Sequence, residues 1–250
     1  MQRITITGGR TLHGRIRPAA AKNSVLPLLA ATLLCRTPSR LRAVPPLADV
    51  ATSLALLQSV GAKAERQGSD LFVAPGQDLQ GEIPDYLAGA MRSSVFYLAP
   101  LLCRVGEVRL PLPGGCKLGP RPVDIHLAGL AAMGAQVELE GIAVTLRRRG
   151  PLHGVDFALR LPSVGATMTL MMAATQAGGT TILRGAACEP EICDLANFLR
   201  ACGAHITGAG TPVVVIQGGK PLQGTAWTPL PDRIAAATYA AALACAGGEV

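Results

Sequence analysis

One short pattern, Leu-x-x-x-Gly-Ala, constrains this chain more than any other feature, because it occurs three times, at residues 57–62, 130–135 and 199–204. The copies lie about 70 residues apart, and each follows apolar residues at helical spacing, such as Val50, Leu54 and Leu57. Each is followed by a strand-like run, and its glycine is expected to end the preceding helix. Self-similarity at this period indicates repeated structural units.

A second element recurs upstream in each unit, as an Ala- and Leu-rich helix leading into a strand at 26–41, 95–110 and 168–183. The repeat therefore predicts that each unit contains a helix, a strand, a second helix and a pair of strands, in that order. Helices with alanine on nearly all faces are expected to be buried all round. Three units around a pseudo-threefold axis would place helices inside and sheets outside. A fourth copy begins at Asp232 without its following strand, from which we expect C-terminal truncation.

The composition indicates a folded protein with a substantial core, with 49% hydrophobic residues in a chain of 250. The start of the chain alternates as a strand does and is not a signal peptide, so export is not expected. The apolar stretches 24–35 and 234–250 are interpreted as buried helices, because spanning a membrane needs roughly 20 strongly apolar residues. Seven cysteines without a C-x-x-C pair argue against a zinc site and a disulfide framework.

A formal net charge of +7 predicts an anionic partner. Nucleic acid is disfavoured because aromatic residues, which stack on bases, make up only 3% of the chain. The basic run 147–149 is interpreted as a solvated strand end. The four histidines are dispersed and predict no metal cluster, and only His126 lies near other candidate residues. Small anionic substrates are therefore the favoured partners.

The starts of the repeated helices are the first candidate sites. Helix N-termini offer unpaired N–H groups and a positive dipole end, which bind phosphate and carboxylate. For any single helix the ordinary interpretation, N-capping by Asn23, Ser24, Ser93 or Thr167, is the favoured one. Cations at equivalent starts favour binding, since quasi-symmetry would bring them to one end. The starts are Lys22-Asn23-Ser24, Arg92-Ser93-Ser94, Ser163-Val164-Gly165-Ala166-Thr167 and Asp232-Arg233.

The second candidate is the Pro- and Gly-rich loop 112–126, which interrupts the second unit. Long loops of this kind often carry function. Cys116 lies outside any apolar helix pattern, and nearby Lys117 and Arg121 would stabilise its thiolate. Most of the other cysteines are interpreted as small apolar core residues.

These segments resemble the UDP-N-acetylglucosamine enolpyruvyl transferase family, in order over the whole chain. The Pro-Gly-Gly-Cys loop is the most specific part of the resemblance. The matching segments are Ala21-Lys22-Asn23, Met91-Arg92-Ser93-Ser94, residues 112–126, Pro162-Ser163-Val164-Gly165-Ala166-Thr167, Glu189-Pro190-Glu191-Ile192 and Leu230-Pro231-Asp232-Arg233.

The resemblance implies an inside-out α/β barrel, with residues 22–229 as a first domain of three repeats and 1–21 and 230–250 as incomplete edges of a second. It implies a cytoplasmic enzyme of peptidoglycan synthesis, acting without metal or organic cofactor. The enolpyruvyl group of phosphoenolpyruvate would move to the 3-hydroxyl of UDP-N-acetylglucosamine, releasing phosphate. The implied partners are these small molecules, with no nucleic acid and no membrane, and the oligomeric state is not readable.

The resemblance also implies residue roles. Cys116 would protonate phosphoenolpyruvate and be the target of fosfomycin, with Lys22 and Arg121 as further catalytic groups. Substrate binding would fall to Lys22, Asn23, Arg92, Arg121, Pro122, Val123, Asp124, Ile125, Ser163, Val164, Gly165 and Arg233.

Three departures from the family pattern limit the expected activity. Leu161 and Pro162 stand where a lysine is common, Ala235 replaces an acidic residue, and the second-domain base has no position here. We therefore expect binding but little turnover from this chain alone. Two alternatives stay open: a shikimate-pathway enolpyruvyl transferase, which would not need Cys116, and a non-catalytic nucleotide-sugar binding fragment.

Overall fold

Three successive α/β units make up most of the computed structural model, which describes residues 3–5, 7–111 and 122–250. Each unit contains a first helix, a strand, a second helix and a hairpin, as the repeat predicted. In the first unit these are α1 (Lys22–Ala31) with the 3-10 helix η1 (Thr32–Leu34), β2 (Ser39–Leu41), α2 (Ala48–Ser59), β3 (Lys63–Gln67) and β4 (Asp70–Ala74).

The other two units follow the same order. The second contains α3 (Asp85–Ala90), the 3-10 helix η2 (Arg92–Tyr97), α4 (Leu98–Val105), β5 (Glu107–Pro111), α5 (Asp124–Ala132), β6 (Gln136–Glu140) and β7 (Ala143–Arg147). The third contains β8 (Asp156–Ala158), α6 (Val164–Gln176), β9 (Thr180–Arg184), α7 (Pro190–Ala201), β10 (His205–Thr207) and β11 (Val213–Gln217). Flanking them are β1 (Leu12–His13), β12 (Ala226–Trp227), α8 (Arg233–Ala246) and β13 (Gly248–Glu249).

The three sheets share one connectivity. Their strand orders are β12-β2-β4-β3, β5-β7-β6 and β10-β11-β9-β8. In each sheet the strand that follows the first helix, β2, β5 or β9, pairs antiparallel with the last strand of its unit. The other edge of this strand pairs with a parallel partner. For β5 that partner is the single bridge from Glu82 to Arg109. For β2 the partner is β12, which comes from beyond the third unit, so the three units close into a ring.

The repeated Leu-x-x-x-Gly-Ala sequence ends the second helix of each unit, as predicted. Its glycines have the left-handed φ values of 93° at Gly61, 100° at Gly134 and 108° at Gly203. The alanine N–H donates to the leucine carbonyl five residues earlier, at 2.9 Å (Ala62 to Leu57), 3.0 Å (Ala135 to Leu130) and 2.9 Å (Ala204 to Leu199). This pattern is the Schellman motif, in which glycine is favoured because it adopts positive φ without a Cβ clash.

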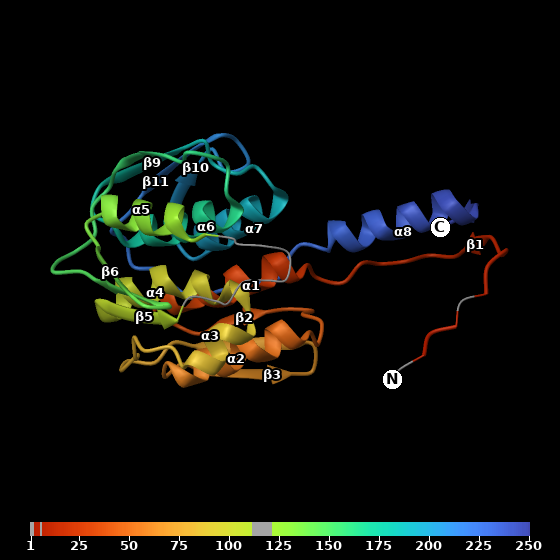
Figure 1. Cartoon of the computed structure of the whole chain (residues 1–250), viewed down its shortest axis with the longest axis horizontal. Coiled ribbons are helices and arrows are strands. Elements are labelled where there is room, and N and C mark those ends of the chain that lie inside the picture. The colour runs from red at the N-terminus through yellow and green to blue at the C-terminus, as the bar shows by residue number, and fades with distance from the viewer. Residues whose placement is uncertain (1–2, 6, 112–121) are drawn as a thin grey trace.

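The first helices lie in the interior and the sheets on the outside, which confirms the predicted architecture (Figure 1). All residues from 24 to 31 of α1 and from 166 to 175 of α6 are buried, as are residues 98–102 of α4. Their small alanine side chains allow close packing of neighbouring helices on every side. The apolar sequence of these helices is thus explained by their central position rather than by a membrane.

The segment 234–250 was predicted to form a buried helix, and the predicted burial is wrong. The segment does form α8, but none of its residues is buried, and Ile234 and Tyr239 are 53% and 47% exposed. Figure 1 shows α8 extending away from the three units, with the N-terminal segment beside it. An apolar pattern predicts a helix but not which element packs against it, and among the described residues it is the N-terminal segment that lies against α8.

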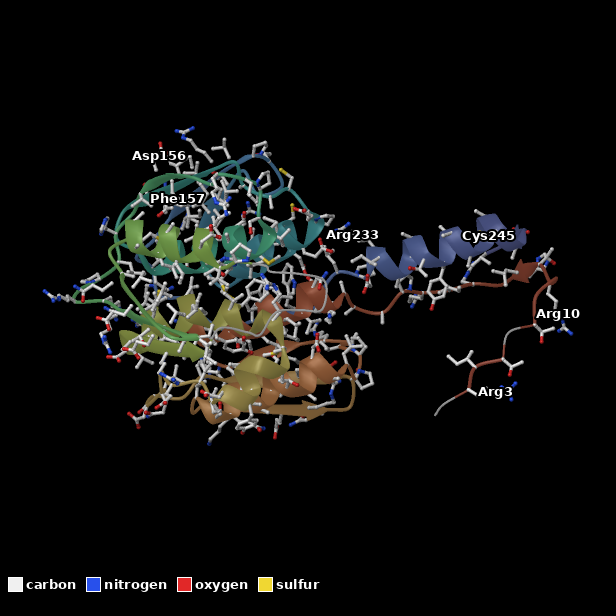
Figure 2. All side chains as sticks on the ribbon, in the orientation of Figure 1. Arg3, Arg10, Asp156, Phe157, Arg233 and Cys245 are labelled. Carbon is white, nitrogen blue, oxygen red and sulfur yellow. The ribbon has the colours of Figure 1, made fainter. Side chains whose placement is uncertain are left out.

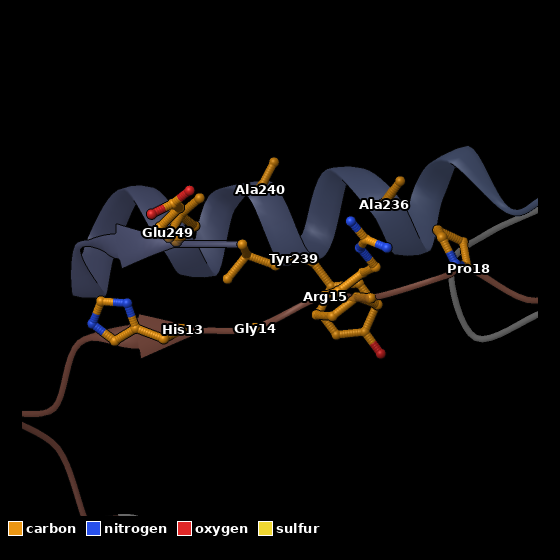
Figure 3. Close-up of a pocket in the computed structure, with 11 residues that line it drawn as sticks. His13, Gly14, Arg15, Pro18, Ala236, Tyr239, Ala240 and Glu249 are labelled. Atoms are coloured by element: carbon orange, nitrogen blue, oxygen red, sulfur yellow. The ribbon is translucent and has the colours of Figure 1, made fainter.

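The N-terminal segment and α8 form a separate part of the structure. Strand β1 pairs parallel with β13, and Ala20 bridges to Pro231. Between them lies a hollow of about 830 Å³, lined by His13, Arg15, Tyr239 and Glu249 among others (Figure 3). The predicted division at 1–21, 22–229 and 230–250 stays a prediction. No helix in the described ranges is long and apolar enough to cross a membrane.

The helix-ending glycines give a first prediction. Gly203→Ala should lower the free energy of unfolding by about 1 to 2 kcal/mol, because an L side chain is strained at positive φ. The added Cβ itself would meet only the Pro221 carbonyl, at 3.9 Å, so the cost is conformational. Urea denaturation measures the change.

Gly89→Ala is the matched control. Gly89 lies inside α3 and has nothing within 4 Å of its Cβ position. Alanine is favoured there by about 0.5 to 1 kcal/mol, so this variant should be unchanged or slightly more stable. Equal destabilisation of both variants would contradict the assigned role of Gly203.

Candidate functional site

A cavity of about 490 Å³ lies where the starts of the repeated helices meet. It is lined by the first residues of α1, η2, α6 and α8, which come from all three units and the following segment. Predicted binding residues in its wall are Lys22, Asn23, Arg92, Pro122, Ser163, Val164, Gly165 and Arg233. Further wall residues are Leu26, Asp49, Ser93, Val95, Phe96, His126, Glu189 and Glu191.

Two of the four helix starts at this cavity, those of α1 and η2, have no side-chain cap, while α6 and α8 are capped by Ser163 and Asp232. Ser24 of α1 instead donates its Oγ hydrogen bond to Asp194. Thr167 accepts a hydrogen bond from the Ala187 N–H at 3.1 Å. N-capping by Asn23, Ser24, Ser93 and Thr167 is therefore wrong, and the cap of α6 is Ser163, which accepts from the Ala166 N–H at 3.3 Å.

Lys22 is held by a carboxylate that the sequence did not single out. Its Nζ lies 2.9 Å from Asp49 Oδ2, and the two side chains are 48% and 35% exposed. Asp49 lies in the first turn of α2, where an acidic residue is common because it complements the helix dipole. Because the helix dipole already explains an acidic residue at this position, nothing in the sequence signals that Asp49 also pairs with Lys22 in the cavity wall.

Arg233 is held in the same way, but by a buried group. Its Nε donates to the Glu191 carboxylate at 3.0 and 3.3 Å. The Glu191 side chain is only 5% exposed, while that of Arg233 is 51% exposed. This hydrogen bond raises the pKa of Arg233 above its usual value. Figure 2 shows Arg233 at the junction between the three units and α8.

A second buried acid on α7 fixes the segment that leads to Arg233. Asp194 accepts hydrogen bonds from Ser24 Oγ, from Trp227 Nε1 at 2.9 Å and from the Leu230 N–H at 3.2 Å. Three donors satisfy a carboxylate that is only 3% exposed. Helix α7 therefore connects the start of α1 to the chain leading into α8.

His126 faces the cavity, and among the described residues neither of its ring nitrogens has a hydrogen-bond partner. Burial, and then the nearby charge of Arg92, lower the pKa of His126 to about 4, so its imidazole is neutral at pH 7. A Cβ on Gly165 would lie 2.7 Å from the Nε2 atom of His126, so only glycine fits at position 165. The sequence singled out His126 by its position but assigned it no role.

The remaining predicted residues lie elsewhere or outside the described residues. Val123 precedes α5 and packs against the core, Asp124 pairs with Arg160 at 2.6 Å, and the Ile125 side chain is buried in the core. None of these three lines the cavity described above. Cys116 and Arg121 fall within 112–121, outside the described residues.

Charge is balanced in the described part of the wall. Its cations are Lys22, Arg92 and Arg233, and its carboxylates are Asp49, Glu189 and Glu191. Within the described ranges, no group of three His, Cys, Asp or Glu side chains is placed to hold a metal ion. The chemistry this wall offers is thus recognition of a small anion by oriented cations and helix starts.

Two residues of the basic run 147–149 are held by structural contacts, in agreement with a strand end. Arg147 ends β7 and pairs with Glu107 at 3.1 Å and with Glu138. Arg148 donates to the carbonyls of Leu102 and Cys103 at 2.9 and 3.0 Å. These contacts favour a structural role over a phosphate-binding patch.

Comparison with known proteins places the chain among enolpyruvyl transferases. A family model described as EPSP synthase (3-phosphoshikimate 1-carboxyvinyltransferase) matches residues 6–250. Proteins named UDP-N-acetylglucosamine 1-carboxyvinyltransferase are 44% identical in Cellvibrio japonicus, 46% in Nitratidesulfovibrio vulgaris and 47% in Acidiphilium cryptum, in each case over 100% of this chain. The chain spans 60% of the length of each of these relatives.

Solved structures give the same architecture. The enolpyruvyl transferase NikO from Streptomyces tendae superimposes with a TM-score of 0.81 at 25% identity, covering 93% of this chain and 55% of that one. EPSP synthase from Acinetobacter baumannii gives a TM-score of 0.77 at 18% identity, covering 97% and 55%. The second likeness concerns the fold alone.

The buried imidazole gives a prediction about stability and pH. Its folded pKa of about 4 lies below the ordinary value of 6.5, so the unfolded chain binds the proton more readily. Stability should therefore fall as the pH drops from about 6.5 to about 4, by on the order of 3 kcal/mol from this group. His126→Leu should flatten that part of the profile, measured by urea denaturation at several pH values.

The exposed His13 provides the control for this experiment. His13→Gln should keep the pH profile of the unmodified chain. If His126→Leu keeps the same slope between pH 6.5 and pH 4 as the unmodified chain, His126 is not desolvated as described.

Proposed function

Since the chain belongs to the EPSP synthase (3-phosphoshikimate 1-carboxyvinyltransferase) family, we propose that it carries the substrate-binding part of an enolpyruvyl transferase. The proposed substrates are phosphoenolpyruvate and UDP-N-acetylglucosamine. The sugar 3-hydroxyl oxygen adds to C2 of phosphoenolpyruvate as C3 gains a proton. Loss of a C3 proton and of phosphate then leaves the enolpyruvyl ether. This assignment implies a cytoplasmic enzyme of peptidoglycan synthesis.

One observation carries the proposal: Lys22, Arg92 and Arg233 line a single cavity although they come from different units of the chain. Phosphoenolpyruvate carries a phosphate and a carboxylate close together, so it needs several cations around one point. Oriented cations and helix starts stabilise anionic charge as it develops during the reaction. The cavity offers both at the same place.

The residue roles proposed here follow the sequence resemblance. Lys22, Asn23 and Arg92 would bind phosphoenolpyruvate, and Cys116 would donate the proton to its methylene carbon with Arg121 nearby. Ser163, Val164 and Gly165 would contact the diphosphate and sugar, with Arg233 beside them. The uridine would meet residues 122–125, where Ile125 can offer only its backbone because its side chain is buried.

The names of the relatives favour this proposal over a shikimate-pathway activity. The proteins that match the whole chain at 44–47% identity are named for the UDP-sugar reaction. The EPSP synthase structure, at 18% identity, supports only the shared fold. The UDP-sugar is therefore the favoured acceptor, and shikimate 3-phosphate is the comparison compound in the test.

Binding to the chain separates the two acceptors. Calorimetric titration should detect UDP-N-acetylglucosamine and give no signal with shikimate 3-phosphate at the same concentration.

Lys22→Ala should weaken phosphoenolpyruvate binding in the presence of the UDP-sugar by at least about tenfold, the loss of one charge-assisted contact. The control is Lys63→Ala on the outer strand β3, which should bind as the unmodified chain does. Binding of shikimate 3-phosphate instead would overturn the proposed acceptor.

Fosfomycin tests the proposed role of Cys116 independently of acceptor choice. The drug should label one cysteine of the chain, and mass spectrometry should locate the label at Cys116. Cys116→Ala should abolish the label and reduce phosphate release from phosphoenolpyruvate, where release occurs, by several orders of magnitude. A label on any other cysteine would contradict the assignment. Binding of the UDP-sugar with no phosphate release would support a non-catalytic binding fragment.

A further inference from the structure

Helices α1 and α7 pack side by side with their starts at the same end, and side-chain contacts join them at both ends. At the cavity end, Ser24 Oγ donates to Asp194. At the far end, Cys35 Sγ and Cys202 Sγ lie 3.7 Å apart. Cys35 follows η1, which extends α1, and Cys202 is the C-cap of α7. The two sulfurs therefore join the first unit to the third.

The two thiols share a buried environment. Cys35 is fully buried and Cys202 is 2% exposed. Arg104 donates to the carbonyls of Leu33 and Cys35 at 2.6 and 3.1 Å, which places a positive charge beside the pair. The hydrogen bond with Cys202 and the charge of Arg104 lower the pKa of Cys35, while the hydrogen bond with Cys35 and burial raise the pKa of Cys202. Cys35 is thus the thiol that more readily ionises.

A small cavity lies against the residues that flank Cys35. A hollow of about 280 Å³ is lined by Leu34 and Arg36, the chain neighbours of Cys35, and by Leu222, its β-bridge partner. Arg36, Arg104 and Lys220 make the wall basic. By contrast, burial raises the pKa of Cys103 to about 12, and within the described ranges no other two cysteine sulfurs are in contact.

We propose that Cys35 and Cys202 are a modification site that is oxidised to an intramolecular disulfide linking the first unit to the third. The sulfurs must close from 3.7 Å to a bond of about 2.05 Å, which side-chain rotation and a small helix shift can supply. A peroxide is the oxidant. The Cys35 thiolate attacks it to form a sulfenic acid and the first water. The Cys202 sulfur then displaces the second water, and each thiol loses its proton.

The bond would act as a staple on the far side of the ring from the candidate site. It closes a loop between residues 167 positions apart, so it restricts the unfolded chain strongly. The site end of the two helices keeps its own Ser24 to Asp194 contact, so the cavity is not directly altered. This inference does not depend on the proposed function.

Peptide mapping of the oxidised chain tests the proposal. The chain is treated with hydrogen peroxide under native conditions, alkylated after unfolding and digested with trypsin. Cys35 lies in tryptic peptide 23–36 and Cys202 in peptide 201–233, and each peptide contains one cysteine. These two peptides should be recovered linked, and a reducing agent should separate them. Cys35→Ser should abolish the link.

The matched control is the double variant Cys188→Ser/Cys245→Ser, which removes two exposed thiols and should keep the link. Figure 2 shows Cys245 on α8, which extends away from the three units. Oxidation should raise the Tm by roughly 10 °C in the unmodified chain and leave that of Cys35→Ser unchanged.

Two results would overturn the proposal. One is recovery of Cys35 and Cys202 as free thiols under conditions that fully oxidise Cys188 and Cys245. The other is a link that forms only when the peroxide is added in urea. A native link that lowers the Tm would contradict the role as a stabilising staple.

Discussion

Closure of the three units into a ring is the constraint on which the rest of the structure depends. The first helices are buried along most of their length and pack against helices of the other units. The ring closes where β12 pairs with β2, and the same returning chain bonds the Ala21 N–H to the Leu230 carbonyl at 2.8 Å. That bond brings the start of α8 beside the start of α1. Arg233 and Lys22 therefore share a cavity because of backbone pairing, before any side-chain contact is considered.

The cavity cations differ in how firmly they are held. Lys22 and Asp49 are both substantially exposed, and pairs of this kind contribute about 0 to 1 kcal/mol, so an entering anion can take Lys22 at little cost. Arg233 pairs with Glu191, whose side chain is only 5% exposed, and a carboxylate with so little access to water is destabilised when its partner leaves. Arg233 thus remains with Glu191 while contributing charge, and Lys22 is the cation free to follow a ligand.

Much of this arrangement could be predicted from the sequence, and the parts that could not were missed for physical reasons. The Leu-x-x-x-Gly-Ala copies predicted the helix ends, and Lys22, Arg92, Ser163 and Arg233 were placed correctly at helix starts. Asp49, Glu191 and Asp194 were missed as site residues because acidic residues near a helix start are common for dipole reasons alone. The exposure of α8 was missed because burial depends on neighbours that a local pattern does not contain.

The central claim is that helix starts from separate units form one anion site. Titration of phosphoenolpyruvate, with UDP-N-acetylglucosamine present, into isotope-labelled chain tests it directly by amide NMR shifts. The account predicts that the largest shifts occur together at Lys22, Arg92 and Gly165, with a common affinity. Largest shifts at the hollow between β1 and α8, or different affinities at the three helix starts, would contradict it.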